Sequence, residues 1–164
     1  MEKVYVGKIV NTFGIKGELK IASRFEMAEK VFLKGQKIIL NNEVYEITGV
    51  RYHKKHYLTQ INHLNDINSV LKYKGLSVFI LKEDLFLKED EYLMRDLLDL
   101  EVYENDTLIG QVTEVTESEV NPLIKINNQF YIPIKANYIK KIDLKNKKIL
   151  TENIKELMLW KLRS

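Results

Sequence analysis

Two glycines separated by two residues could place a phosphate near the start of the chain. Residues 7–21 read GKIVNTFGIKGELKI, with Gly14 and Gly17 at a bend and Lys16 between them. A P-loop needs G-x-x-x-x-G-K-[ST] between a strand and a helix, and a dinucleotide loop needs a helix whose N-terminus faces the anion. Here Glu18 follows the second glycine, and the next run is strand-like. We therefore predict that Gly14 and Gly17 form a structural turn with positive φ, which holds Lys16 out at the bend.

Residue types that support catalysis are present, but their spacing does not fit a catalytic site. Eleven acidic residues between 88 and 119 offer many carboxylate pairs, yet none has a fixed spacing tied to the end of a helix or strand. The chain has no cysteine, and no nucleophile elbow surrounds its serines. His53 and His56 flank Lys54 and Lys55, whose charges would repel a metal ion. We expect no catalysis, no cofactor and no metal; a metal-dependent hydrolase that uses the acidic residues is the enzymatic alternative.

Positive charges and aromatic rings gather around one expected hairpin. Arg51, Lys54 and Lys55 surround it, with tyrosines and histidines interleaved. Lysine and arginine bind phosphates, and aromatic rings stack on unpaired bases, so the pattern suits RNA. Packing of the rings at the mouth of a barrel is the alternative. The candidate RNA-binding residues are Lys8, Lys16, Arg24, Arg51, His53, Lys54 and Lys55.

Charge is distributed in three blocks along the chain. Residues 1–84 carry 14 Lys/Arg and 9 Asp/Glu, a net charge of +5. Residues 88–119 carry 2 and 11, a net charge of −9, and residues 120–164 carry 10 and 3, a net charge of +7. Basic blocks suit a polyanionic partner, and an acidic block suits a basic protein. Solvated faces whose signs happen to cluster are the alternative.

Short apolar runs separated by turn residues predict an all-β fold that positions these side chains. In the first half, strands are expected at 4–10, 18–22, 36–40, 44–50, 50–52, 57–61 and 76–81. Asn41-Asn42 predicts a hairpin turn, since asparagine tolerates positive φ. Residues 65–73 are expected to form a short helix capped by Asn65 or Asp66. These elements favour a small antiparallel barrel.

The second half predicts another small barrel. Hairpin-like pairs are expected at 100–103 with 108–115, 123–126 with 130–134, and 139–144 with 148–150. Pro133 lies inside one run, which places that strand at an edge or a bulge. The tail 154–162 is expected to be a short helix. Residues 84–99 interrupt the strand pattern, so we expect domains at 1–83 and 99–164 with a linker at 84–98.

The chain of 164 residues, 45% of them apolar and 30% charged, fits a folded protein of one domain or two small ones. The N-terminus is charged at once and lacks an apolar signal core, and no apolar run approaches the ~20 residues of a membrane span. We expect a cytoplasmic protein, or the mature form of an organellar one, without membrane contact.

Several stretches, taken in order, resemble the RimM family of ribosome maturation factors. Residues 6–10 and 14–21 resemble the opening of that family, and 50–54 resemble its basic hairpin. Glu91-Tyr92 followed by Asp96-Leu97-Leu98 resembles its interdomain segment. The stretches at 110–112, 132–134, 142–144 and 148–149 resemble its C-terminal PRC-barrel.

The resemblance implies a six-stranded N-terminal barrel similar to a domain of translation elongation factors, followed by a PRC-type barrel. It implies a non-enzymatic assembly chaperone, expected to act as a monomer. Such proteins bind the immature small ribosomal subunit and assist folding of its head domain and processing of 16S ribosomal RNA. They contact the nineteenth protein of that subunit.

The resemblance also implies a protein-binding segment between the barrels. The residues that it marks as contacts to a protein partner are Tyr92, Leu93 and Asp96; the family shows a second tyrosine where this chain has Leu93. The alternative function is a PRC-barrel adaptor that binds proteins and makes no direct RNA contact.

Overall fold

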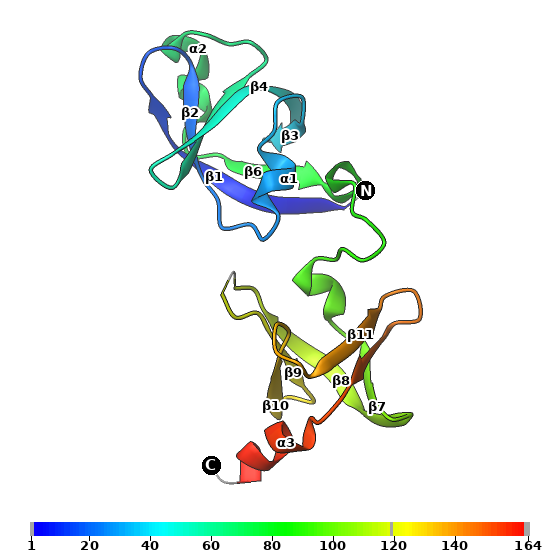
Figure 1. The fold of residues 1–164 in the computed structure, drawn as a ribbon. Coiled ribbons are helices and arrows are strands. Elements are labelled where there is room, and N and C mark those ends of the chain that lie inside the picture. The colour runs from blue at the N-terminus through cyan, green and yellow to red at the C-terminus, as the bar shows by residue number, and fades with distance from the viewer. Residues whose placement is uncertain (1, 119, 163–164) are drawn as a thin grey trace. The chain divides into compact units, whose positions relative to one another are not determined.

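The computed structural model describes residues 2–118 and 120–162, which form two compact units divided between residues 89 and 90 (Figure 1). Residue 1 of the expected first domain, and residues 119, 163 and 164 of the expected second, lie outside this description. Each unit contains six strands with a few short helical turns. The predicted all-β fold is confirmed.

The first unit is a closed barrel with the strand order β1-β2-β5-β4-β3-β6. Its strands are β1 Lys3–Phe13, β2 Glu18–Ala22, β3 Lys37–Leu40, β4 Glu43–His53, β5 His56–Ile61 and β6 Ser77–Leu81. Its helical turns are α1 Ala28–Val31, α2 Ile67–Val70, η1 Leu71–Tyr73 and η2 Lys82–Leu85. Alternate strand residues such as Leu19 and Ile21 are fully buried, because successive side chains of a strand point to opposite faces.

Strand β1 closes the barrel by pairing with two neighbours along different parts of its length. Lys3 to Lys8 pair with β6, and Lys8 to Phe13 pair with β2. The register shifts between Tyr5 and Gly7 and again between Ile9 and Asn11, and such bulges bend a strand. A Cβ atom on Gly7 would lie 2.6 Å from the Ala22 carbonyl oxygen, so the bend needs glycine there.

The turn residues of the first unit form the structures that their types predict. Asn41 and Asn42 have φ of 48° and 65° and connect β3 to β4 as a two-residue hairpin turn, which confirms that prediction. The expected short helix is present as α2 followed by η1, with Asp66 at its N-cap position. The Asp66 side chain makes no capping hydrogen bond.

Both glycines of the opening motif adopt positive φ, as predicted. Gly14 has φ of 64° and open space around it, whereas Gly17 has φ of 85° and is tightly enclosed. A Cβ atom on Gly17 would lie 2.5 Å from the Leu64 carbonyl oxygen. The β1–β2 turn is further held by the Ile67 N–H, which donates to the Ile15 carbonyl oxygen at 3.1 Å. No helix follows Gly17, because β2 begins at the next residue.

The second unit is a six-stranded sheet with the order β10-β9-β8-β7-β12-β11. Its elements are η3 Met94–Leu97, β7 Glu101–Glu104, β8 Thr107–Thr116, β9 Leu123–Ile126, β10 Phe130–Pro133, β11 Ile139–Asp143, β12 Lys148–Thr151 and α3 Lys155–Leu162. Strand β12 pairs with β7 in parallel, and the other pairs are antiparallel. Pro133 lies on the edge strand β10, and the C-terminal helix is present, as both patterns predict.

The two ends of the segment expected to link the barrels pack onto the units beside them. Leu85 is buried at the end of η2, beside the first barrel. Met94 and Leu97 are buried in the apolar core of the second unit, together with Val102, Ile126 and others. The two units therefore draw on this segment for their own packing.

No helix in residues 2–118 and 120–162 is both long and apolar enough to cross a membrane.

Gly17→Ala should destabilise the first unit far more than Gly14→Ala. Both substitutions place a Cβ on a left-handed backbone, which costs about 1–2 kcal/mol, but only Gly17→Ala also forces a clash with the Leu64 backbone. We expect a loss of about 3 kcal/mol or more for Gly17→Ala. Hydrogen exchange of the β1 and β2 amides measures this, and equal losses for the two variants would contradict the prediction.

Candidate nucleic-acid interface

An open pocket of about 660 Å³ lies on the first unit where the β1–β2 turn meets β4. Its lining includes Lys16, Glu18, Gly49, Arg51, Gln60 and Asn65. Two of the predicted RNA-binding residues, Lys16 and Arg51, therefore share one site although they are far apart in the sequence. The lining carries both positive charge and amide groups, which can donate and accept hydrogen bonds.

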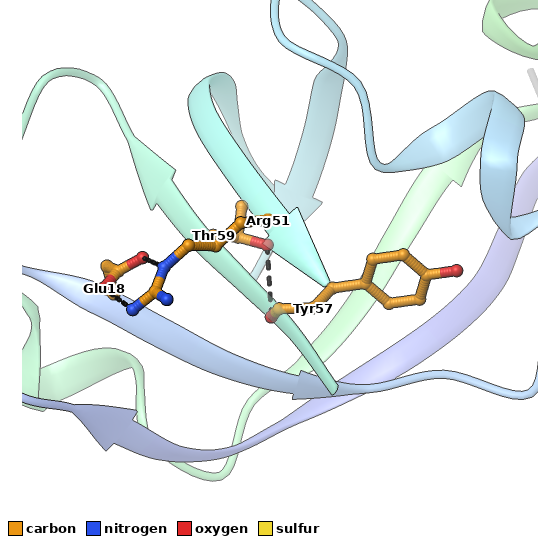
Figure 2. A network of polar contacts seen from close by, with 4 residues as sticks. All are labelled: Glu18, Arg51, Tyr57 and Thr59. Atoms are coloured by element: carbon orange, nitrogen blue, oxygen red, sulfur yellow. Dashed lines mark hydrogen bonds and ion pairs between the residues drawn. The ribbon is translucent and has the colours of Figure 1, made fainter. Parts of the chain in front are cut away.

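A bidentate ion pair joins Glu18 of β2 to Arg51 of β4 (Figure 2). Arg51 Nε donates to Glu18 Oε2 at 2.9 Å, and Nη2 donates to Oε1 at 3.0 Å. The Arg51 side chain is 55% exposed and that of Glu18 is 23% exposed. The guanidinium group is therefore fixed in direction but still open to solvent, and a phosphate that takes its Nε and Nη2 donors must displace Glu18.

Strand pairing brings the two partners of this ion pair together. Strand β5 lies between β2 and β4, with Lys20 opposite Leu58 and Leu58 opposite Arg51. The Thr59 side chain of β5 is fully buried. Its hydroxyl donates a hydrogen bond to the Tyr57 carbonyl oxygen at 3.4 Å (Figure 2). The neighbouring order β2-β5-β4 therefore brings Arg51 within reach of Glu18, which lies two residues before Lys20 on β2.

An aromatic and cationic cluster continues from this pair. The Arg51 guanidinium lies 5.5 Å from the centre of the Phe13 ring, and the Phe13 and His53 rings meet edge to face at 5.4 Å. Cation–π and edge-to-face contacts both favour these arrangements. His53 therefore joins the Arg51 site through Phe13.

The Glu18 carboxyl has a lowered pKa. Hydrogen bonds from Arg51 are the main cause, opposed by partial burial and assisted by electrostatic interactions with Arg51, Lys16 and His53. The Glu18 carboxylate in turn raises the pKa of Arg51. Both groups are therefore charged at neutral pH, and the surroundings of Glu18 are electropositive.

The turn between β4 and β5 carries Lys54 and Lys55 in an unusual backbone conformation. Their φ values are 46° and 68°, and both side chains are exposed. In the described part of the chain, the other two-residue hairpin turns use Asn41-Asn42 and Asn105-Asp106 at these positions. Asparagine, aspartate and glycine tolerate positive φ, whereas lysine incurs a steric cost. The paired lysines here therefore carry a steric cost that asparagine or glycine would avoid.

The aromatic residues of the same hairpin divide into two kinds. Tyr57 is half-buried and stacks on Phe32, with ring centres 4.2 Å apart. Tyr52 is 64% exposed and rests its edge against Tyr57 at 5.0 Å. Packing accounts for Tyr57, and Tyr52 presents a ring to solvent beside the lysines.

Lys8 and Arg24 are exposed but lie apart from the pocket. Lys8 pairs with Ala22, and Arg24 follows the end of β2, so both are at the end of the β1–β2 ribbon opposite to Lys16. The structure thus groups Lys16, Arg51 and His53, continues from them to Lys54 and Lys55, and leaves Lys8 and Arg24 as a separate pair.

The three residues expected to contact a protein partner have different environments. Tyr92 is half-buried against the core of the second unit. Asp96 accepts a hydrogen bond from the Leu93 N–H at 3.1 Å and so caps η3. Leu93 is 1% exposed, and its contact with a partner stays a prediction.

Sequence reasoning missed several residues of the site. Phe13 and Glu18 were not expected to shape the surroundings of Arg51, and Gln60 and Asn65 were not expected to line a pocket. The signal for Glu18 was its position at the start of a strand that pairs, through β5, with the basic hairpin. Among the described residues, no group of three or more His, Cys, Asp or Glu is placed to hold a metal ion.

Two family models match the chain, one for each unit. Residues 4–85 match the model described as the RimM N-terminal domain, and residues 94–157 match the RimM PRC barrel domain. Together with the strand orders above, these matches define a class of protein in which a six-stranded barrel with a basic hairpin precedes a PRC barrel.

Relatives match along almost the whole length of the chain. A protein named ribosome maturation factor RimM from Staphylococcus aureus is 33% identical over 95% of this chain and 99% of its own. One of the same name from Staphylococcus haemolyticus is 34% identical over 90% and 93%. A solved RimM structure from Pseudomonas aeruginosa covers 92% of this chain and 96% of its own, with a TM-score of 0.46 and 20% identity. The chain belongs to the RimM family.

The Glu18–Arg51 pair should make the first unit sensitive to acid. Because the folded pKa of Glu18 lies below its ordinary value of 4.5, the pair stabilises the fold above pH 4.5. This stabilisation is lost as the pH falls through the lowered pKa. Carbon-detected NMR of the Glu18 carboxyl should give a midpoint below 4.5, and Arg51→Gln should move it up towards that value. An unchanged midpoint in Arg51→Gln would contradict the assignment.

Proposed function

We propose that this chain is a cytoplasmic ribosome maturation factor. It binds the immature small ribosomal subunit as a monomer and assists folding of the head domain and processing of the 16S RNA precursor. Membership of the RimM family supports this proposal, as do relatives with that name along almost the whole chain. The mechanism is non-enzymatic: simultaneous binding of two components favours the RNA conformation that brings them together, and no covalent step is needed.

RNA contacts are assigned to the basic hairpin of the first unit. The observation that carries this assignment is the pair Lys54-Lys55, exposed at the tip in left-handed conformations. The lysines would hold phosphates, and the exposed Tyr52 ring would stack on an unpaired base. Lys8 and Arg24 would extend the contact along a longer RNA path.

Arg51 would join this contact by exchanging one anion for another. Its Nε and Nη2 donors are both engaged by Glu18. A phosphate has the same bidentate geometry as a carboxylate, so it can replace Glu18 without a change in the direction of the guanidinium group. The Phe13 ring then keeps the side chain in place during the exchange.

Contacts to a basic protein are assigned to the acidic stretch of the second half, with 11 acidic and 2 basic residues between 88 and 119. Tyr92 and Asp96 are the candidate contact residues there, and ribosomal protein nineteen of the small subunit is the proposed partner. Opposite charges favour such an encounter and raise its rate.

Capture from a lysate separates this function from that of an adaptor. The tagged chain should recover immature small subunits in preference to mature ones. Lys54→Glu with Lys55→Glu should abolish that recovery if RNA contact is needed. Lys34→Glu with Lys37→Glu makes the same charge change at exposed residues outside the hairpin and should retain it. Recovery that survives the hairpin variant would favour a protein-only adaptor.

Replacement of Lys54-Lys55 by Asn-Gly should separate stability from RNA binding. Asn-Gly is the favoured pair for this turn, so we expect the first unit to gain about 1 kcal/mol in its free energy of unfolding. Loss of two phosphate contacts should weaken binding to 16S precursor RNA. It should also reduce the magnitude of the negative slope of log K against log salt by about 2. Hydrogen exchange and an RNA titration at several salt concentrations measure the two effects. Unchanged RNA affinity in a more stable protein would remove the assignment.

A further inference from the structure

We propose that the β11–β12 hairpin of the second unit is a second binding surface for RNA phosphates. Residues 139–151 contain five lysines and one aspartate, Asp143, a net charge of +4. The lysines are Lys140, Lys141, Lys145, Lys147 and Lys148; the first four are exposed and Lys148 is half-buried. The inference rests on the proposed action on ribosomal RNA. It extends the RNA contact to the second unit, whose acidic stretch is proposed to bind a basic protein.

Strand pairing gathers these lysines at one border of the sheet. Strand β11 is at the edge of the sheet, beside β12. The register shifts between Ile139 and Lys141, and this bulge leaves the consecutive residues Lys140 and Lys141 both exposed. A regular strand would point such neighbours to opposite faces. The bulge therefore adds a cation to the exposed border.

The turn of this hairpin repeats the feature found at Lys54 and Lys55. The Lys147 N–H donates to the Leu144 carbonyl oxygen at 3.2 Å, and Lys147 itself has φ of 55°. The register pairs Asp143 with Lys148, which leaves a four-residue connection, 144–147, whose last residue is in the left-handed region that favours glycine or asparagine. Lysine again occupies a position where one of those residues fits better, in a second hairpin of different sequence.

Two carboxylates lie near the lysines and do not cancel their charge. Asp143 accepts hydrogen bonds from the Asn146 backbone N–H at 3.1 Å and from Asn146 Nδ2 at 2.8 Å, which lower its pKa and tie it to the turn. Glu101 of β7 is the register partner of Lys148. Lys141 and Lys148 also interact electrostatically with Asp143, but five lysines outnumber these two carboxylates, so the border keeps an excess of positive charge.

An aromatic ring lies on the neighbouring strand. The Lys148 ammonium group is 6.0 Å from the centre of the Tyr103 ring, and Tyr103 is opposite Leu150 in the β12–β7 pair. Cations beside a half-exposed ring suit a polyanion whose phosphates alternate with flat bases. An acidic protein would need no such ring, so we favour RNA as the occupant.

Protection of the sheet edge is the competing role for some of these lysines. Charged residues, lysine above all, prevent an edge strand from pairing with another chain. Glutamate serves that role as well as lysine does, whereas RNA binding needs the positive sign. Reversal of the charge at Lys140, Lys141 and Lys145 therefore separates the two roles, because none of the three has positive φ.

The test compares four full-length proteins for binding to free 16S precursor RNA across a range of salt concentrations. Lys140→Glu with Lys141→Glu and Lys145→Glu should lower the salt slope by about 2 to 3 and weaken binding at least about tenfold near 0.1 M salt. The unchanged protein is the reference. Lys34→Glu with Lys37→Glu and Lys74→Glu reverses three exposed lysines elsewhere and should have a much smaller effect. The fourth protein carries Lys54→Glu with Lys55→Glu and reports on the first unit.

The outcomes distinguish this inference from the proposed function. If only the Lys54/Lys55 variant loses RNA binding, the β11–β12 hairpin is not an RNA surface, and the proposed function stands. If only the β11–β12 variant loses it, the second surface is supported and the assignment to the first unit fails. Self-association of the β11–β12 variant without loss of RNA binding would show edge protection and overturn the inference.

Lys147→Gly tests the role of this turn in RNA binding without the risk that a misfolded variant explains a loss of binding. It removes one charge and places glycine at the left-handed position, so the thermal midpoint should stay level or rise. RNA binding should still weaken, with a slope lower by about 1. A stable variant with an unchanged slope would overturn the role of this turn.

Discussion

The first unit depends on one strand that hydrogen-bonds to two partners in succession. Strand β1 leaves β6 and joins β2 near Lys8, and bulges on either side of that point bend it through the change. Gly7 permits the bend because any side chain there would collide with the Ala22 backbone. Without the bend, the sheet would keep two open edges.

The candidate interface lies on the part of this barrel formed by the neighbouring strands β1, β2, β5 and β4. Glu18 is at the start of β2, Phe13 is at the end of β1, and both contact Arg51 of β4, with β5 in between. A long and flexible arginine is thus fixed by a carboxylate in one direction and a ring in the other. An arginine that binds a phosphate normally loses side-chain conformational entropy, which weakens the contact. Arg51 has already lost that entropy in the free protein, because its side chain is held in place.

Local features could be predicted from the sequence, and contacts between distant residues could not. Each of three local signals predicted a feature, because the residue type favours a particular backbone conformation or position. Asn41-Asn42 predicted a hairpin turn, Gly14 a bend and Pro133 an edge strand. The pairing of Glu18 with Arg51 spans 33 residues and depends on the register of two strand pairs. The low exposure of Leu93 likewise follows from contacts that its neighbours in the sequence do not reveal.

The lysines in left-handed turns also bear on what holds each hairpin in its conformation. Asn41-Asn42 favours its turn before any tertiary contact exists, whereas Lys54-Lys55 opposes its own. The β3–β4 hairpin therefore has local support for its register, whereas the register of β4 and β5 depends on contacts with the rest of the barrel. The turn at Lys54 and Lys55 is therefore held in its conformation by the barrel around it and does not itself help to hold the barrel.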